Sequence, residues 1–197
     1  MPVPEYLAKH YEKTSVELTL EDVIRNSEGV PETSQINRVK TIARVQAGID
    51  KYRAEAKTMS KSQLQTEKHD SKRLGIFLDA LVKSRPPRCQ AHAIISGLHP
   101  LAIDLRIVMA ACGMRIDDVL NGCWLPENTK ACPHPVYPKA PPHSRIHRKT
   151  YYIWLASMIN KYNCKHINVL RTKLKLITQM LHQHNFPENI LKLEESV

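Results

Sequence analysis

The sequence lacks a segment typical of a transmembrane helix or of a signal peptide. One of its longest apolar stretches, residues 101–112, is interrupted by Asp104 and Arg106, so it cannot supply the roughly 20 apolar residues that a transmembrane helix needs. The chain begins Met-Pro-Val-Pro and lacks the charged and apolar regions of a signal peptide. We therefore expect neither membrane insertion nor export by a cleaved signal peptide.

Closely spaced cysteine pairs are also missing. The five cysteines form an odd, widely separated set without a Cys-x-x-Cys motif, which indicates free thiols in a reducing compartment. A structural zinc site at Cys123, Cys132 and His134 is an alternative, although the spacing fits no common zinc finger. The five are Cys89, Cys112, Cys123, Cys132 and Cys164.

Acidic side chains are too few to balance the basic ones. There are 19 Asp and Glu against 29 Lys and Arg, which gives a formal charge of +10. Such an excess favours a polyanionic partner, with nucleic acid first and an anionic membrane surface second, or else a merely solvated basic surface. The 197 residues, 42% of them apolar, suit one folded core with a helical appendage rather than two full domains.

The N-terminal part contains one strongly periodic segment. Residues 1–33 show little periodicity and predict a loosely structured lead-in. From Ser34 to about Lys57, apolar residues from Ile36 to Tyr52 recur every three or four positions with basic residues between them, which predicts a long basic helix with one packed stripe. Residues 57–72 resemble a polar linker, and a short helix at 74–82 is expected to stop before Pro86.

The pattern changes near residue 88. We expect a strand at 89–95, a helix at 101–112, and then a turn, a short helix and a strand that ends at Pro126. A stiff proline-rich loop follows and leads to Ser144, the expected cap of a helix that reaches about Tyr162. A last helix carries an apolar face, formed by Leu170, Leu174, Ile177 and Leu181.

Three histidines have the spacing of a metal site. His143 and His147 would share one face of a helix, and His92 on the predicted strand would supply a third ligand. Imidazole nitrogens suit Zn²⁺, Ni²⁺ or Mn²⁺ better than Mg²⁺, although supply in the cell also matters. Taken singly, each histidine would be interpreted as an ordinary hydrogen-bonded residue.

Read in order, these segments resemble the AHH family of nucleases. The pattern consists of Ala91-His92 followed by Ile94-Ile95, the pair Asn121-Gly122 before a short apolar strand, and the His-x-x-x-His pair. The AHH family belongs to the HNH, or ββα-metal (His-Me finger), superfamily, and its members are mostly toxin domains of bacterial polymorphic and secreted toxins. The resemblance covers about residues 88–161.

The resemblance implies an α+β, mostly helical fold in which helices wrap a small ββα-metal core. Residues 1–87 would form an N-terminal helical extension or linker. Residues 88–197 would form the nuclease domain with its C-terminal helix.

The resemblance also implies roles for individual residues. His92, His143 and His147 would bind one divalent ion (Zn, Ni, Mn or Mg), and Asn121 would orient the general base. In the family motif, Ala-His-His, the second histidine is that base, whereas this chain has Ala93, whose methyl group accepts no proton.

Since a general base typically contributes about 10²- to 10⁴-fold in rate, we expect this chain to be severely impaired. We interpret Ala93 as a His-to-Ala change made to tolerate a toxic nuclease, with a naturally degenerate homologue as the alternative. Strict alternation would send residues 92 and 93 to opposite strand faces, so both could reach one site only at a frayed or bulged strand end.

The functional hypothesis is a metal-dependent endonuclease toxin that hydrolyses DNA in a target bacterial cell. Superfamily analogy favours DNA over RNA, and Arg145, Arg148 and Lys149 are expected to bind phosphates beside the metal. The toxin would be secreted by a specialised bacterial system, delivered to the target cytoplasm, and neutralised in the producer by an acidic immunity protein.

Two alternatives belong to other classes of protein. One is a non-catalytic nucleic-acid-binding module with a structural metal site. The other is a helical adaptor of a secretion system, in which the histidines have no common role.

Overall fold

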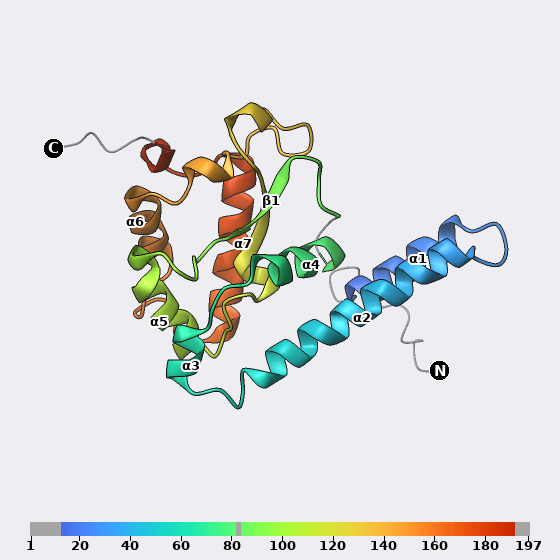
Figure 1. Cartoon of the computed structure of the whole chain (residues 1–197), viewed down its shortest axis with the longest axis horizontal. Coiled ribbons are helices and arrows are strands. Elements are labelled where there is room, and N and C mark those ends of the chain that lie inside the picture. The colour runs from blue at the N-terminus through green and yellow to red at the C-terminus, as the bar shows by residue number, and fades with distance from the viewer. Residues whose placement is uncertain (1–12, 82–83, 192–197) are drawn as a thin grey trace, which may run out of the picture.

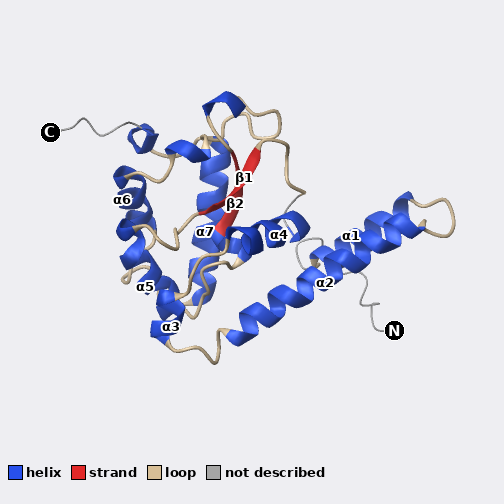
Figure 2. Ribbon diagram, in the orientation of Figure 1, coloured by secondary structure: helices blue, strands red, loops and turns tan. Residues whose placement is uncertain are grey.

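The computed structural model describes residues 13–81 and 84–191. Figure 1 and Figure 2 show mostly helices around a two-stranded hairpin, which confirms the predicted fold class. In the described residues, no helix is both long and apolar enough to cross a membrane. The helices and strands are α1 (Ser15–Asn26), α2 (Thr33–Glu55), α3 (Lys61–Thr66), α4 (Ser71–Leu81), β1 (Cys89–Ala93), α5 (Ile103–Ala111), β2 (Gly122–Pro126), α6 (Lys149–Met158) and α7 (Ile167–Gln183).

The hairpin pairs β1 and β2 antiparallel, with His92 opposite Cys123 and Ala93 opposite Gly122. Successive side chains of a strand point to opposite faces, so His92 and Ala93 separate here. The face with Cys89 and Ala93 packs against α2 and α4, whereas the His92 side chain meets residues near α6.

Two apolar clusters cover the two faces of the hairpin. The larger one joins β2 to α5, α6 and α7, and all four predicted apolar residues of α7 are fully buried. The smaller one joins Leu74, Phe77 and Leu78 of α4 to Ala93 and to Ile49 and Tyr52 of α2. Gly122 allows this packing, because a Cβ atom there would lie 2.7 Å from a Leu74 methyl carbon. The hairpin is therefore held from both sides.

The N-terminal helices agree only in part with the prediction. The long basic helix is confirmed as α2, but only Ile49 and Tyr52 of its predicted stripe are buried. The prediction of a loosely structured lead-in at residues 1–33 is wrong for the described residues, which begin at 13. These residues form α1, with a capping box between Thr14 and Glu17. Ser60 caps α3 with the same motif, so part of the polar linker predicted at residues 57–72 is helical.

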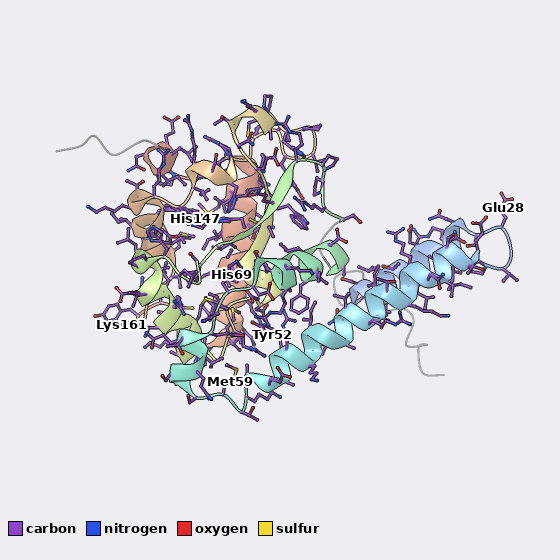
Figure 3. All side chains as sticks on the ribbon, viewed as in Figure 1. Glu28, Tyr52, Met59, His69, His147 and Lys161 are labelled. Carbon is purple, nitrogen blue, oxygen red and sulfur yellow. The ribbon has the colours of Figure 1, made fainter. Side chains whose placement is uncertain are left out.

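We call α1 and α2 the arm. Figure 1 shows the arm as a helical pair that extends from the α4 side of the molecule, and Figure 3 places Glu28 at its outer end and Tyr52 where α2 meets the core. The guanidinium of Arg53 donates two 2.8 Å hydrogen bonds to Asp118, and the Tyr52 hydroxyl accepts one from the Asp117 backbone N–H at 3.0 Å. The arm is thus attached at its inner end, by polar contacts as well as by Ile49 and Tyr52.

The C-terminal half largely follows the prediction, with α5, β2 and α7 at the expected places. The two tryptophans, Trp124 and Trp154, are buried in the core. The boundary expected at residue 88 stays a prediction, although α4 before it packs into the same core as the strands.

Candidate metal centre

His92, His143 and His147 come together in space. Their ligand atoms all lie within 4.8 Å of one another, and in the described part of the chain no other group of three or more histidine, cysteine, aspartate or glutamate side chains is gathered closely enough to hold a metal ion. The ring centroids are 4.8 Å apart for His92 and His147, 5.3 Å for His92 and His143, and 5.5 Å for His143 and His147. Figure 3 shows His147 between α6 and the hairpin.

The two downstream histidines do not share a helix face, so this part of the prediction is wrong. His143 begins a 3-10 turn (His143–Arg145), and α6 starts only at Lys149, after the extended residue Arg148. The chain bends between them and buries the Ile146 side chain completely in the larger cluster. A turn therefore brings His143 and His147 to His92, where sequence spacing alone had suggested a helix from Ser144.

Hydrogen bonds determine which ring nitrogen of His92 can bind a metal ion. The Tyr151 hydroxyl lies 3.0 Å from the Ile94 carbonyl oxygen, to which it donates, and 3.0 Å from Nε2 of His92, from which it accepts. The proton of His92 is therefore on Nε2, and Nδ1 carries the lone pair. Nδ1 is buried and has no hydrogen-bond partner among the described residues. A buried acceptor without a partner is what a metal ligand looks like before the ion binds.

The other two rings are oriented in a similar way. Nδ1 of His143 lies 2.9 Å from the amide oxygen of Gln90, and Nδ1 of His147 lies 2.8 Å from the Tyr152 hydroxyl. An Nδ1–H that donates to these oxygens leaves the lone pair on Nε2, which is then the nitrogen able to bind a metal. Partners of this kind commonly fix the tautomer and orientation of metal-binding histidines.

Burial keeps the three imidazoles neutral. Desolvation lowers the pKa of His92 well below its ordinary value, and the charges of His147 and His143 lower it further. Desolvation also lowers the pKa of His143, and it lowers that of His147 to about 4 with a smaller effect from His143. Neutral imidazole is the form that binds a metal, so the protonation state at pH 7 fits a divalent ion. Three nitrogen ligands would leave coordination positions for water and phosphate.

Ala93 and Asn121 lie near the group but do not face it. The Ala93 side chain is buried in the smaller cluster, across the hairpin from the histidines. The Asn121 side chain accepts a 2.8 Å bond from the Ile95 N–H and donates to the carbonyl oxygens of Ile95 and Ile116. Asn121 thus fixes the backbone just beyond β1, and its role toward a general base stays a prediction.

The three predicted phosphate-binding residues differ in their surroundings. Arg145 and Lys149 are exposed. Arg148 is partly buried and donates a 2.6 Å hydrogen bond to the Leu191 carbonyl oxygen. Two of the three side chains are therefore free to reach solvent beside the histidines, while one is partly engaged within the fold.

Several residues that orient the histidines were not among the sequence candidates. Gln90 could have been found, because it lies two positions before His92 on the same strand face. Tyr151 and Tyr152 give no comparable signal, since two tyrosines at a helix start are ordinary core residues.

The alternative zinc site does not form. All five cysteines are free, and Cys123, Cys132 and His134 are not gathered as ligands. His134 instead lies with Nε2 2.8 Å from the Pro87 carbonyl oxygen, and its Nδ1 accepts from the Val136 N–H at 3.2 Å.

Comparison with known proteins gives a single result. A family model described as "AHH: a nuclease family of the HNH/ENDO VII superfamily with conserved AHH" matches residues 76–183, which is more than half of the chain and includes all three histidines. Neither the curated proteins nor the solved structures searched gave a match. The order β1, β2, α6, with the three histidines converging between these elements, agrees with that superfamily assignment. The chain belongs to the AHH family of nucleases.

Proposed function

We propose that this chain is an endonuclease of the AHH family that acts on DNA with a divalent metal held by His92, His143 and His147. The observation that carries the proposal is the convergence of the three histidines, one of which, His92, has a buried Nδ1 without a hydrogen-bond partner among the described residues. The net charge of +10 supports a polyanionic substrate.

The chain's own residues would bind and orient the reactants. A divalent ion in such a site polarises the scissile phosphate and lowers the pKa of bound water. Gln90, Tyr151 and Tyr152 hold the rings in the neutral tautomers that accept it. Arg145 and Lys149 are exposed and would bind the phosphates on either side of the cleaved bond.

We further propose that water activation is the impaired step. The family motif has a histidine after the strand ligand, and this chain has Ala93 there. The Ala93 methyl lies in an apolar cluster on the opposite face of the hairpin, where it can neither accept a proton nor approach the histidines. A histidine at this position would have to re-form the end of β1 to reach the site.

The biological setting is part of the same proposal. The activity would be that of a toxin, secreted by a specialised bacterial system into the cytoplasm of a target cell. An acidic immunity protein would neutralise it by covering its basic surface. The family resemblance and the excess of positive charge support this setting.

The alanine at position 93 favours a second function, a nucleic-acid-binding module. A chain that naturally has Ala93 would keep the three metal-binding histidines but lack the general base, so it would bind nucleic acid without cutting it quickly.

Cleavage of supercoiled plasmid separates the two functions. The chain and its Ala93→His variant would be compared with Mg²⁺, Mn²⁺, Zn²⁺ or Ni²⁺ and with EDTA, after thermal unfolding has shown that both are folded. The proposal expects metal-dependent nicking that is faster by about 10²-fold or more in the variant. The His143→Ala substitution should abolish the nicking. The His166→Ala substitution should not, because His166 is an exposed histidine outside the group. Folded proteins that bind DNA but never cut it, with or without metal, would favour the binding module.

A further inference from the structure

A groove of about 1090 Å³ lies between the arm and the core, and the candidate metal ligand His143 is one of its lining residues. Residues of α1, α2 and α4 form most of its lining. The rest includes Gln90 and Ala91 of β1, Trp124, and the ligand His143. Figure 1 shows α4 between the arm and the hairpin, in agreement with this arrangement. A molecule in the groove would therefore touch the arm and one metal ligand at once.

The charged side chains of the groove are mostly positive. Arg38 of α2, Lys72 of α4 and Arg85 line it, together with one carboxylate, Asp79. That carboxylate accepts a 2.7 Å hydrogen bond from the backbone N–H of Arg85. Within residues 13–81 and 84–191, neither Arg38 nor Lys72 forms a salt bridge, and both are exposed. Such cations in a concave surface attract a polyanion.

The arm lies outside the family match, which begins at residue 76. Its inner end is nevertheless fixed to the matched region, because Arg53 pairs with Asp118 and Arg115 pairs with Glu55 at 2.7 Å. The arm therefore adds a basic wall to the nuclease in a defined position.

We propose that a DNA strand lies in this groove, with its phosphates on Arg38 and Lys72, and reaches the metal centre past Gln90 and His143. The arm is then a part of the substrate site and not merely a connector. This inference rests on the proposed function, since it assumes that the substrate is DNA. Trp124 is almost fully buried, so the groove holds the strand through charge and shape and not through base stacking on that indole.

Two exposed basic residues of α2 offer a matched control. Arg38 and Lys72 line the groove, whereas Lys40 and Arg44 of α2 are equally exposed and do not line it. The double variants Arg38→Gln/Lys72→Gln and Lys40→Gln/Arg44→Gln each remove one arginine and one lysine. Any difference between them reports position and not net charge.

Fluorescence anisotropy of labelled DNA with the full-length chain in EDTA measures the effect without cleavage. The groove variant, Arg38→Gln/Lys72→Gln, should bind DNA about five- to tenfold more weakly for each cation removed near 0.1 M salt. The slope of log affinity against log salt should fall by about two. The Lys40→Gln/Arg44→Gln variant should stay within about twofold of the parent. Equal losses in the two variants, or no loss in the groove variant, would overturn the proposal while leaving DNA as the substrate.

Two further readouts keep this result separate from the proposed function. Ni²⁺ binding to the groove variant should match the parent, because neither cation contacts a histidine of the metal centre. A photo-crosslinking residue at Thr41, which lines the groove, should capture DNA, and one at Lys40 should not. A parent chain that binds no DNA at all would instead contradict the proposed function itself.

Discussion

The core and the arm of this protein are stabilised by different forces. In the core, α7 buries Leu170, Leu174, Ile177 and Leu181 completely against the hairpin side of the molecule. In the arm, α2 has 23 residues and buries only Ile49 and Tyr52, and α1 buries only Val23. Apolar burial therefore fixes the elements that carry the histidines, whereas the outer arm exposes its charges to solvent. The closely packed core suits a metal site that must keep its ligands in place, and the exposed basic arm suits the binding of a polyanion.

The largest effect is expected from removing the buried ligand. His92→Ala should abolish measurable binding of Zn²⁺ or Ni²⁺ in calorimetry, because the two remaining histidines are half of a typical four-coordinate shell. His166→Ala tests a histidine outside the group and should bind as the parent does. Unchanged affinity in folded His92→Ala would show that the metal binds elsewhere.

Truncation of one apolar residue in each region tests the comparison directly. Leu174→Ala in α7 should lower the free energy of unfolding by about 2–5 kcal/mol, because it leaves a cavity in a close-packed core. Ile36→Ala in the arm should change it by less than about 0.5 kcal/mol, since Ile36 is 38% exposed. Urea denaturation measures both. Similar losses at the two positions would mean that the arm is packed as firmly as the core.

The Asp117 carboxylate, which binds the start of α4 beside the arm junction, should stabilise the fold less in acid. Burial would raise the pKa of Asp117, but hydrogen bonds from His69 and Arg73 outweigh burial and lower it below its usual 3.8. This carboxylate therefore stabilises the fold above about pH 4, and the contribution is lost as the pH falls further. Asp117→Asn should lower stability at pH 7 by about 1–3 kcal/mol, because Arg73 loses a partner but stays partly exposed.

Thermal unfolding between pH 3 and pH 7 checks this prediction. The parent should lose stability toward pH 3 more steeply than Asp117→Asn. Parallel curves would show that Asp117 has no part in the pH dependence.

The smallest effect is expected from a residue that only orients a ligand. Tyr152→Phe removes the hydroxyl beside Nδ1 of His147 and should weaken Zn²⁺ binding by about tenfold, near the lower end for such partners. Tyr162→Phe is a suitable control, because Tyr162 is exposed and outside the group. An effect as large as that of His92→Ala would mean that the hydroxyl itself is a ligand or supports the fold.

The sequence was sufficient for the features that depend on local periodicity or on motif order. The recurrence of apolar residues every three or four positions predicts α7, and the three histidines follow from the family pattern. The helices α1 and α3 were also readable, since Thr14 with Glu17 and Ser60 with Gln63 are capping boxes.

Other features depend on contacts between distant residues. The helix expected from Ser144 begins later, because burial of Ile146 favours a bend over a continuous helix. The junction of the arm joins Arg53 to Asp118, 65 positions apart, and no local pattern predicts that pair. The groove is lined by residues of α1, α2, α4 and β1, which are distant in the sequence, so it too could not be predicted from one sequence.

X-ray absorption spectroscopy of the zinc-loaded chain tests the central claim most directly. Coordination by His92, His143 and His147 predicts a shell of nitrogen and oxygen at about 2.0–2.1 Å with the multiple-scattering pattern of imidazole, and no sulfur. The imidazole pattern should disappear in His92→Ala. Sulfur at about 2.3 Å, or an imidazole pattern that survives in that variant, would contradict the assignment of the three histidines as the metal centre.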